Sequence, residues 1–280
     1  MTSHINSATG AETLAKFLDN QISLLIQLEP KVRKSDILRV RRIHPLFAGI
    51  IEDTISIRLL GNDSRLNQAY VISRALLERI TNYCYLQLCQ DEVFQNYIDY
   101  SVNKGGRRID RSVEADGRVR ARIALKDGIL TLSPEVSASI AKFTSERGRE
   151  KTRWTNTSLP ERAAAIEAKL GSTGLFVSLL TIYGDASEAL HGTLYGAIFH
   201  LGAYDFGSTP HDQASLERHT YSTLSCLYLM AGGAIDTLLS LLSAVGENHS
   251  HIFAIDSSKG FKRTSQECGL IGPVSGINQT

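Results

Sequence analysis

Apolar residues recur every three or four positions along most of the chain, which is the period of an amphipathic α-helix. This pattern predicts long helices, whereas no run alternates like a β-strand for more than a few residues. The expected helices cover 11–29, 44–62, 66–89, 91–102, 133–148, 158–171, 174–202 and 212–245. The predicted fold class is therefore all-α, a multi-helix bundle whose central helices are 66–89, 174–202 and 212–245.

The helical period is lost between residues 103 and 153. This stretch contains thirteen Lys or Arg and seven Asp or Glu, a local charge of +6, whereas the whole chain carries +1 and the remainder therefore −5. We interpret it as an irregular basic insertion, either an exposed loop or a short hairpin-like excursion. The expected organisation is one helical domain, 1–245, with 103–153 inserted in it. Residues 246–280 are polar and without period, so they are predicted to be a disordered, dispensable tail.

Composition narrows the class of protein. The chain is 42% hydrophobic and 21% charged, as in an ordinary globular protein. Its four cysteines form no C-x-x-C pair and no metal-binding pattern is present, so we expect neither a metal nor a cofactor. The chain opens without a signal peptide, which favours the cytoplasm. Leu224–Val245 is long enough to span a bilayer but contains one charge and several Ser, Thr and Gly residues, so we predict a buried helix and no membrane partner.

Candidate chemistry begins with the stretch "YGDASEALHG", where Tyr183, Ser187 and His191 are spaced by four residues. On a helical wheel these three lie within or beside an apolar stripe and are therefore expected to be at least partly buried. The stripe consists of Phe176, Leu180, Leu190, Leu194, Ile198 and Leu201. Buried polar groups need partners, because each unsatisfied group costs about 1–3 kcal/mol.

The predicted partners lie in "SRALLER", where Arg74 and Glu78 are one helical turn apart. If the two helices pack, Arg74 holds Glu78, and Glu78 accepts a hydrogen bond from Tyr183 or His191. Trp154 is expected to cover the cluster. The five polar residues are interpreted either as a structural network or as a functional site, and the sequence leaves both open.

These residues resemble a family of uncharacterised, mainly bacterial helical proteins whose members share an R-x-x-x-E helix and a later Y-x-x-x-S-x-x-x-H helix. The resemblance covers residues 40–205. The chain is more distantly similar to the HEPN superfamily, helical domains common in toxins and phage defence, many of which are metal-independent ribonucleases with an R-x(4–6)-H motif. His191 lacks an Arg at that spacing, since positions 185–187 are Asp, Ala and Ser.

The residues and the resemblance together leave three alternatives for function. In a nuclease or nucleotide-processing enzyme, His191 is the general acid or base, Arg74 binds phosphate, and Glu78 orients them. In a binding or sensing module, the cluster closes around a small ligand or only fixes the bundle. In an interaction protein, the last helix forms a homo-oligomer interface. A nucleic-acid partner is expected to meet Arg107, Arg108 and Arg111 of the basic segment.

Overall fold

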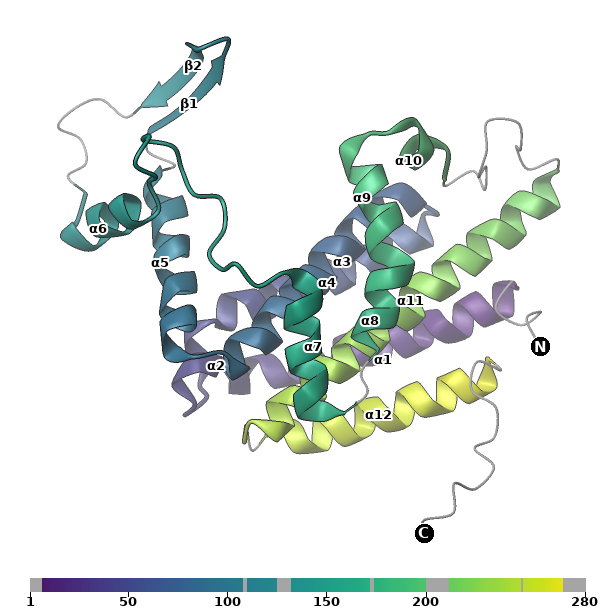
Figure 1. The fold of residues 1–280 in the computed structure, drawn as a ribbon. Coiled ribbons are helices and arrows are strands. Elements are labelled where there is room, and N and C mark those ends of the chain that lie inside the picture. Colours follow the sequence, from purple (N-terminus) through teal and green to yellow (C-terminus); the bar gives the residue numbers. More distant parts are fainter. Residues whose placement is uncertain are drawn as a thin grey trace. The chain divides into compact units, whose positions relative to one another are not determined.

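The computed structural model describes residues 7–107, 110–124, 132–171, 174–199, 212–247 and 249–268. Helices dominate these residues, as the apolar period predicts (Figure 1). The helices are α1 (Ala8–Arg33), α2 (Leu38–Arg42), α3 (His44–Asn62), α4 (Leu66–Leu88), α5 (Asp91–Arg107), α6 (Pro134–Lys142), α7 (Leu159–Leu170), α8 (Leu175–Ser178), the π-helical turn η1 (Leu179–Tyr183), α9 (Gly184–His191), α10 (Leu194–Phe199), α11 (Gln213–Ala244) and α12 (Ser250–Glu267). Two strands, β1 (Asp110–Ala115) and β2 (Arg118–Ala124), form a hairpin.

The chain divides into two compact units. The main unit comprises Met1–Leu88 and Leu159–Thr280, and the inserted unit is Cys89–Ser158. The predicted basic excursion lies inside the inserted unit, but the unit begins earlier and has regular structure of its own: α5, the β1–β2 hairpin and α6.

The main unit is built around α4, which packs against α3, α7, α9 and α11. Its side chains are buried at helical spacing, including Leu66, Tyr70, Leu77, Ile80 and Cys84. The central helix expected at 66–89 is therefore confirmed as a core element. The helix places Arg74 and Glu78 beside the core on a face that is only partly buried.

Local signals fix several helix ends. Asp212 caps α11 by accepting from the backbone N–H of Ser215 at 2.7 Å, and Ser133 caps α6 by accepting from Val136 at 3.4 Å. Gly171 follows α7 with φ of 82°, a left-handed conformation that terminates helices and favours glycine. Helix α6 ends at Lys142, earlier than the expected end near Gly148.

The predicted tail is partly wrong. Residues 250–267 form α12, which packs against α11 and α1 (Figure 1). Ser257 donates to Gln21 of α1 at 2.9 Å, and Ser258 donates to Asp236 of α11 at 2.8 Å. The packed face of α12 is made of Ser, Thr and Ala, so it lacks the apolar period that would have predicted a helix. Residues 269–280 lie outside the described part of the chain.

Helix α11 passes the length and composition test for a membrane span, as the only such helix among the described residues. Its most apolar 18-residue window is 78% buried inside the fold. At Gly232, an added Cβ would lie 2.1 Å from the ring of Phe17, so α1 approaches α11 too closely for a side chain. The apolar surface of α11 is used to build the core, which is compatible with a soluble protein.

The predicted helix 174–202 is interrupted. It consists of α8, the wide turn η1, α9 and α10, and Gly192 ends α9 with φ of 66°. Gly196 of α10 lies against the backbone of Glu188, where an added Cβ would be 2.4 Å from the carbonyl. Gly196 therefore permits a close approach of α10 to α9, whereas Gly192 caps α9.

Candidate functional site: an Arg–Glu–Tyr–Ser cluster between two helices

The cluster predicted from the sequence forms where α4 meets η1 and α9, all within the main unit. Arg74 lies at its centre. Its Nε donates to Glu78 Oε1 at 3.2 Å, its Nη1 to Ser187 Oγ at 2.9 Å, and its Nη2 to Tyr183 OH at 3.1 Å. The guanidinium also lies 4.5 Å from the centroid of the Tyr183 ring, within cation–π range. The prediction that Arg74 or Glu78 reaches the second helix is confirmed.

Tyr183 joins the two charged groups. Its hydroxyl accepts from Arg74 and donates to Glu78 Oε1 at 2.9 Å. Burial, together with the hydrogen bond and charge of Glu78, raises the pKa of Tyr183, and Arg74 only partly offsets this. The phenol therefore remains a neutral donor at physiological pH. Ser187 donates to the Tyr183 carbonyl at 2.7 Å, which leaves its oxygen lone pairs directed to Arg74.

A second arginine, missed by the sequence analysis, belongs to the cluster. Arg162 of α7 interacts electrostatically with Glu78 and Tyr183, and its Nη1 donates to Asn82 of α4. Burial lowers the pKa of Arg162 even though Glu78, Tyr85 and Tyr183 act in the opposite direction. Arg162 therefore adds a second guanidinium next to Glu78 and Tyr183. No local sequence signal indicates this, because α7 reaches α4 only through tertiary packing.

His191 is not buried, and the sequence prediction is wrong on this point. It is the last residue of α9 and is exposed, one turn beyond Ser187. No hydrogen bond joins its ring to the cluster within the described ranges. Since the helix ends at Gly192, the side chain at its last position faces solvent.

The apolar stripe expected on this helix is also wrong. Phe176, Leu180, Leu190 and Leu194 are 37%, 84%, 51% and 58% exposed. The buried face instead consists of Leu175, Ser178, Ile182 and Ala186. These four residues recur every three or four positions and so share one helix face, and it is this face that packs against α4 and α11. Small side chains at Ser178 and Ala186 let the neighbouring helices approach closely. Ile198 is partly buried, and Leu201 lies outside the described residues.

Trp154 belongs to the inserted unit. Its ring meets Tyr97 edge-on at 5.0 Å, and its carbonyl accepts from Asn96. The expectation that Trp154 covers the Arg74 cluster stays a prediction.

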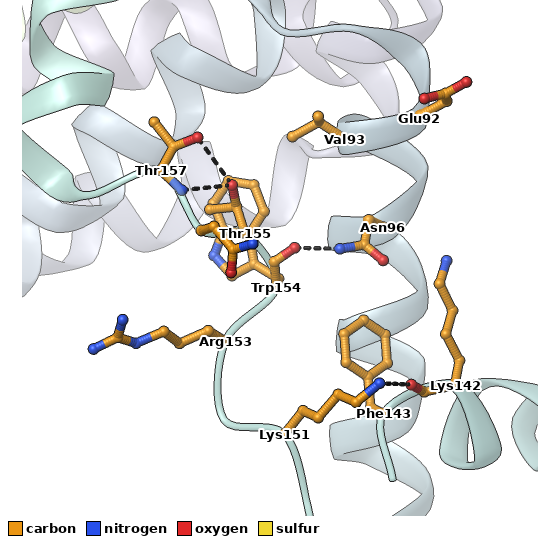
Figure 2. A pocket seen from close by; sticks show the side chains of 11 residues that line it. Glu92, Val93, Asn96, Lys142, Phe143, Lys151, Arg153, Trp154, Thr155 and Thr157 are labelled. Atoms are coloured by element: carbon orange, nitrogen blue, oxygen red, sulfur yellow. Dashed lines mark hydrogen bonds between the residues drawn. The ribbon is translucent and has the colours of Figure 1, made fainter. Parts of the chain in front are cut away.

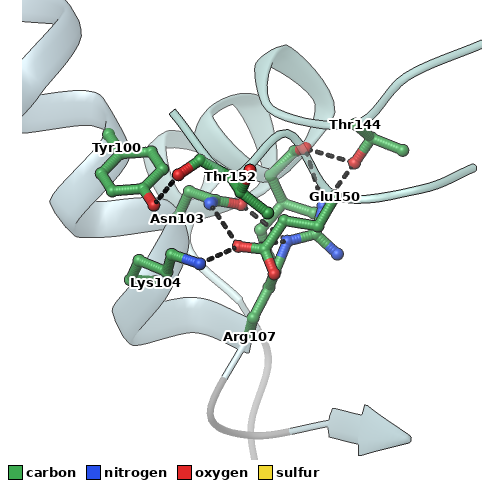
Figure 3. Close-up of polar contacts among 8 residues, drawn as sticks. Tyr100, Asn103, Lys104, Arg107, Thr144, Glu150 and Thr152 are labelled. Carbon is green, nitrogen blue, oxygen red and sulfur yellow. Dashed lines mark hydrogen bonds and ion pairs between the residues drawn. The ribbon is translucent and has the colours of Figure 1, made fainter. Parts of the chain in front are cut away.

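The three arginines expected to meet nucleic acid differ from one another. The Arg107 side chain makes its contacts within the inserted unit (Figure 3). Its Nε donates to Asn103 Oδ1 at 2.8 Å and lies 3.7 Å from Glu150 Oε1, and its Nη2 donates to Thr144 Oγ1 at 2.5 Å. This network holds α5 against the segment that follows α6. Arg108 lies outside the described residues. Arg111 is the second residue of β1.

The turn of the β1–β2 hairpin contains a recognisable sequence signal, the pair Asp116-Gly117. Asp116 and Gly117 have φ of 53° and 70°, as in the tight turn that an Asp-Gly pair favours between alternating strands. It presents Arg118 to solvent, while Arg120 pairs with Asp116 at 3.0 Å.

No group of three His, Cys, Asp or Glu side chains that could hold a metal ion occurs within the described ranges. The four cysteines are free thiols, and burial raises the pKa of Cys226 and Cys268. The Arg74 cluster can orient a guanidinium and a neutral hydroxyl donor toward a ligand.

Fold and site together define a helical protein with an Arg–Glu–Tyr–Ser network between two core helices. Residues 41–208, more than half of the chain, match the model of a family of unknown function, DUF5677, and the chain belongs to this family. The matched region contains all the residues of the cluster and the whole inserted unit, whereas α11 and α12 follow it. Comparison with curated proteins and with solved structures gave no match.

Proposed function

We propose that the chain binds a phosphate-bearing ligand, a nucleic acid or a nucleotide, beside Arg74, and that His191 acts on the bound phosphate. The observation that carries this proposal is the arrangement of Arg74. Its guanidinium is fixed by three side chains, stays 19% exposed, and lies against a helix whose next turn ends in an exposed histidine. Pre-organised guanidinium groups bind phosphate well because they lose little entropy on binding.

Charge supports the choice of an anionic ligand. Arg74 and Arg162 contribute two positive charges and Glu78 one negative charge, while Tyr183 stays neutral. The balance is +1 in a partly buried place, where charge is screened less than on an open surface. A phosphate would bring negative charge next to these two arginines.

The chemistry would be metal-independent phosphodiester cleavage. In RNA, the 2′-oxygen attacks phosphorus, its proton passes to the His191 imidazole, and the 5′-oxygen leaves and takes up a proton. Arg74 would stabilise the negative charge that develops on the phosphoryl oxygens, and Glu78 would orient Arg74. The π-helical turn that ends at Tyr183 is consistent with this role, since such turns are frequent at functional sites. Bacterial origin, a role in phage defence and a cytoplasmic location belong to the same proposal, through the resemblance to HEPN proteins.

The test is an RNA-cleavage and RNA-binding assay in the presence of a chelator. We expect His191→Ala to abolish cleavage and Arg74→Lys to weaken binding and cleavage, while both keep the far-UV spectrum and melting midpoint of a folded chain. His249→Ala, another exposed histidine, is the matched control and should behave as the wild type. Absence of both binding and cleavage in the wild-type protein would overturn the proposal.

A structural network is the second candidate, and one observation favours it. All three nitrogens of Arg74 already have partners inside the fold. In that case Arg74→Lys lowers stability, by about 1–3 kcal/mol, and His191→Ala changes nothing, because His191 is exposed. The two variants together therefore distinguish the candidates.

A further inference from the structure

The inserted unit contains a pocket of about 600 Å³ (Figure 2). Its walls are the first turns of α5, the end of α6 and the segment 151–157. This segment has no regular structure but is fastened to α5, since Tyr100 OH donates to the Thr152 carbonyl at 2.7 Å and Asn96 donates to the Trp154 carbonyl. The pocket is therefore held open by side-chain bonds within one unit.

Aromatic rings form one side of the pocket. Trp154 is partly buried, and its ring is supported edge-on by Tyr97 at 5.0 Å and 80°. Phe143 lies deeper, 3% exposed, with its own edge-on contact to Tyr100 at 5.2 Å. An indole fixed in this way is a planar apolar surface that needs no reordering to stack on a flat ligand.

Three basic residues also line the pocket. Lys142 pairs with Asp99 at 2.6 Å, and Lys151 Nζ donates to the Lys142 carbonyl at 3.1 Å. Arg153 is exposed, and the described residues offer its guanidinium no partner. Figure 2 shows the Arg153 side chain extended from the segment that bears Trp154. Glu92 is the acidic residue of the lining, so positive charge dominates.

We propose that this pocket binds a nucleotide unit, with the base packed on Trp154 and the phosphate held by Arg153. A flat ring next to a free guanidinium matches the two parts of a nucleotide, and stacking with electrostatic contact is how proteins bind single-stranded nucleic acid. The unit is either a free nucleotide or one residue of a strand, because both present the same base and phosphate. This site is independent of the Arg74 cluster: it lies in the other unit and has its own readout.

Trp154 provides that readout, because it is the only tryptophan among the 280 residues. Its emission, excited at a wavelength that adenine does not absorb, is measured while adenosine monophosphate or a short oligoadenylate is added to the full chain. Stacking should quench the emission, and salt should weaken the effect. Quenching by both ligands indicates a free nucleotide as the occupant, quenching by the oligonucleotide alone indicates a strand, and either supports the proposal.

Variants then test the two halves of the site. Arg153→Gln should weaken binding about tenfold, as expected for loss of one charge-assisted contact. Arg147→Gln is the matched control, because Arg147 is exposed in the same unit and does not line the pocket. Trp154→Leu, followed by anisotropy of a labelled oligoadenylate, should lose most of the binding.

The proposal is overturned if neither ligand changes the emission at millimolar concentration, or if Arg153→Gln and Arg147→Gln bind equally well. Melting curves of all variants establish that each is folded. Loss of RNA cleavage in His191→Ala with unchanged quenching of Trp154 would separate this site from the Arg74 cluster.

Discussion

The Tyr183 hydroxyl links the two helices of the main cluster, because it accepts from Arg74 and donates to Glu78. Removing it leaves the ring and the cation–π contact in place but takes one acceptor from Arg74. Replacing Tyr183 by Phe is therefore the single substitution that tests these hydrogen bonds with the least other change.

We expect Tyr183→Phe to lower the free energy of unfolding by about 1–2 kcal/mol, as for a hydrogen bond to a charged group. Urea unfolding followed by far-UV circular dichroism measures the change. Tyr221→Phe on α11 is the control, because among the described residues its hydroxyl has no hydrogen-bond partner. An equal effect of both variants would contradict the role given to Tyr183.

In the inserted unit, Glu150 is the residue that joins several polar side chains, as Tyr183 does in the main cluster (Figure 3). Its Oε1 accepts from Lys104 at 2.8 Å and from the buried Asn103 at 3.2 Å. Burial would raise the pKa of Glu150, but the hydrogen bonds and charges of Lys104, Asn103 and Arg107 hold it below its usual value of 4.5. The pKa of Lys104 is raised above 10.5, first by its hydrogen bond to Glu150.

The sign of the pH dependence follows. A carboxyl group whose folded pKa is lowered stabilises the fold above its unfolded pKa, and this is lost as pH falls through the folded value. Glu150→Gln should therefore cost roughly 1 kcal/mol near neutral pH, the pair being partly screened by solvent. The difference from wild type should shrink below pH 4.5. Urea unfolding followed by Trp154 emission measures it, and the exposed Glu146→Gln should show no such pH-dependent difference.

Among the elements, α12 changes the expectation for the C-terminus most. It buries Ser257 and covers Gln21, which is itself 1% exposed, and Phe261 of α12 lies 6.0 Å from the ring of Phe17 in α1. These contacts make α12 part of the main unit.

A chain ending after Gly246 should therefore melt at a clearly lower temperature, contrary to the expectation from sequence. The loss should exceed about 2 kcal/mol, because Gln21 is left without its partner and apolar surface of α1 and α11 is exposed. A chain ending after Cys268 retains α12 and is the control. An unchanged midpoint on removal of α12 would show that its packing contributes no stability.

For the whole molecule, α11 is the helix that bears on whether the chain enters a membrane. Leu224–Val245 contains one charged residue, Asp236. Burial raises the pKa of Asp236 above its usual value, and the hydrogen bond from Ser258 offsets only part of this rise. The most apolar window of α11 is 78% buried, and the helix packs against α1, α4 and α12, so most of its apolar surface lies inside the fold.

We expect the purified chain to remain in the supernatant after ultracentrifugation without detergent, and not to co-sediment with lipid vesicles. The measurement is the distribution of the chain between pellet and supernatant. Recovery only after detergent extraction would show that α11 enters a bilayer.

The sequence by itself determined the helical class, most helix positions in the main unit, and the pairing of Arg74 and Glu78 with Tyr183 and Ser187. It could do so because helical period and capping are local, and because buried polar groups must find partners. The bounds of α7 and α11 follow the predicted ranges closely for the same reason.

Only the tertiary structure decided the rest. The face of α8, η1 and α9 that packs against α4 and α11 is not the apolar one, so several leucines remain exposed, and the helix end at Gly192 leaves His191 in solvent. Arg162 joined the cluster through the packing of α7 on α4, and α12 was hidden because small polar residues form its buried face. These features depend on which helices meet, and a contact between distant segments is a property of the packed fold rather than of either segment alone.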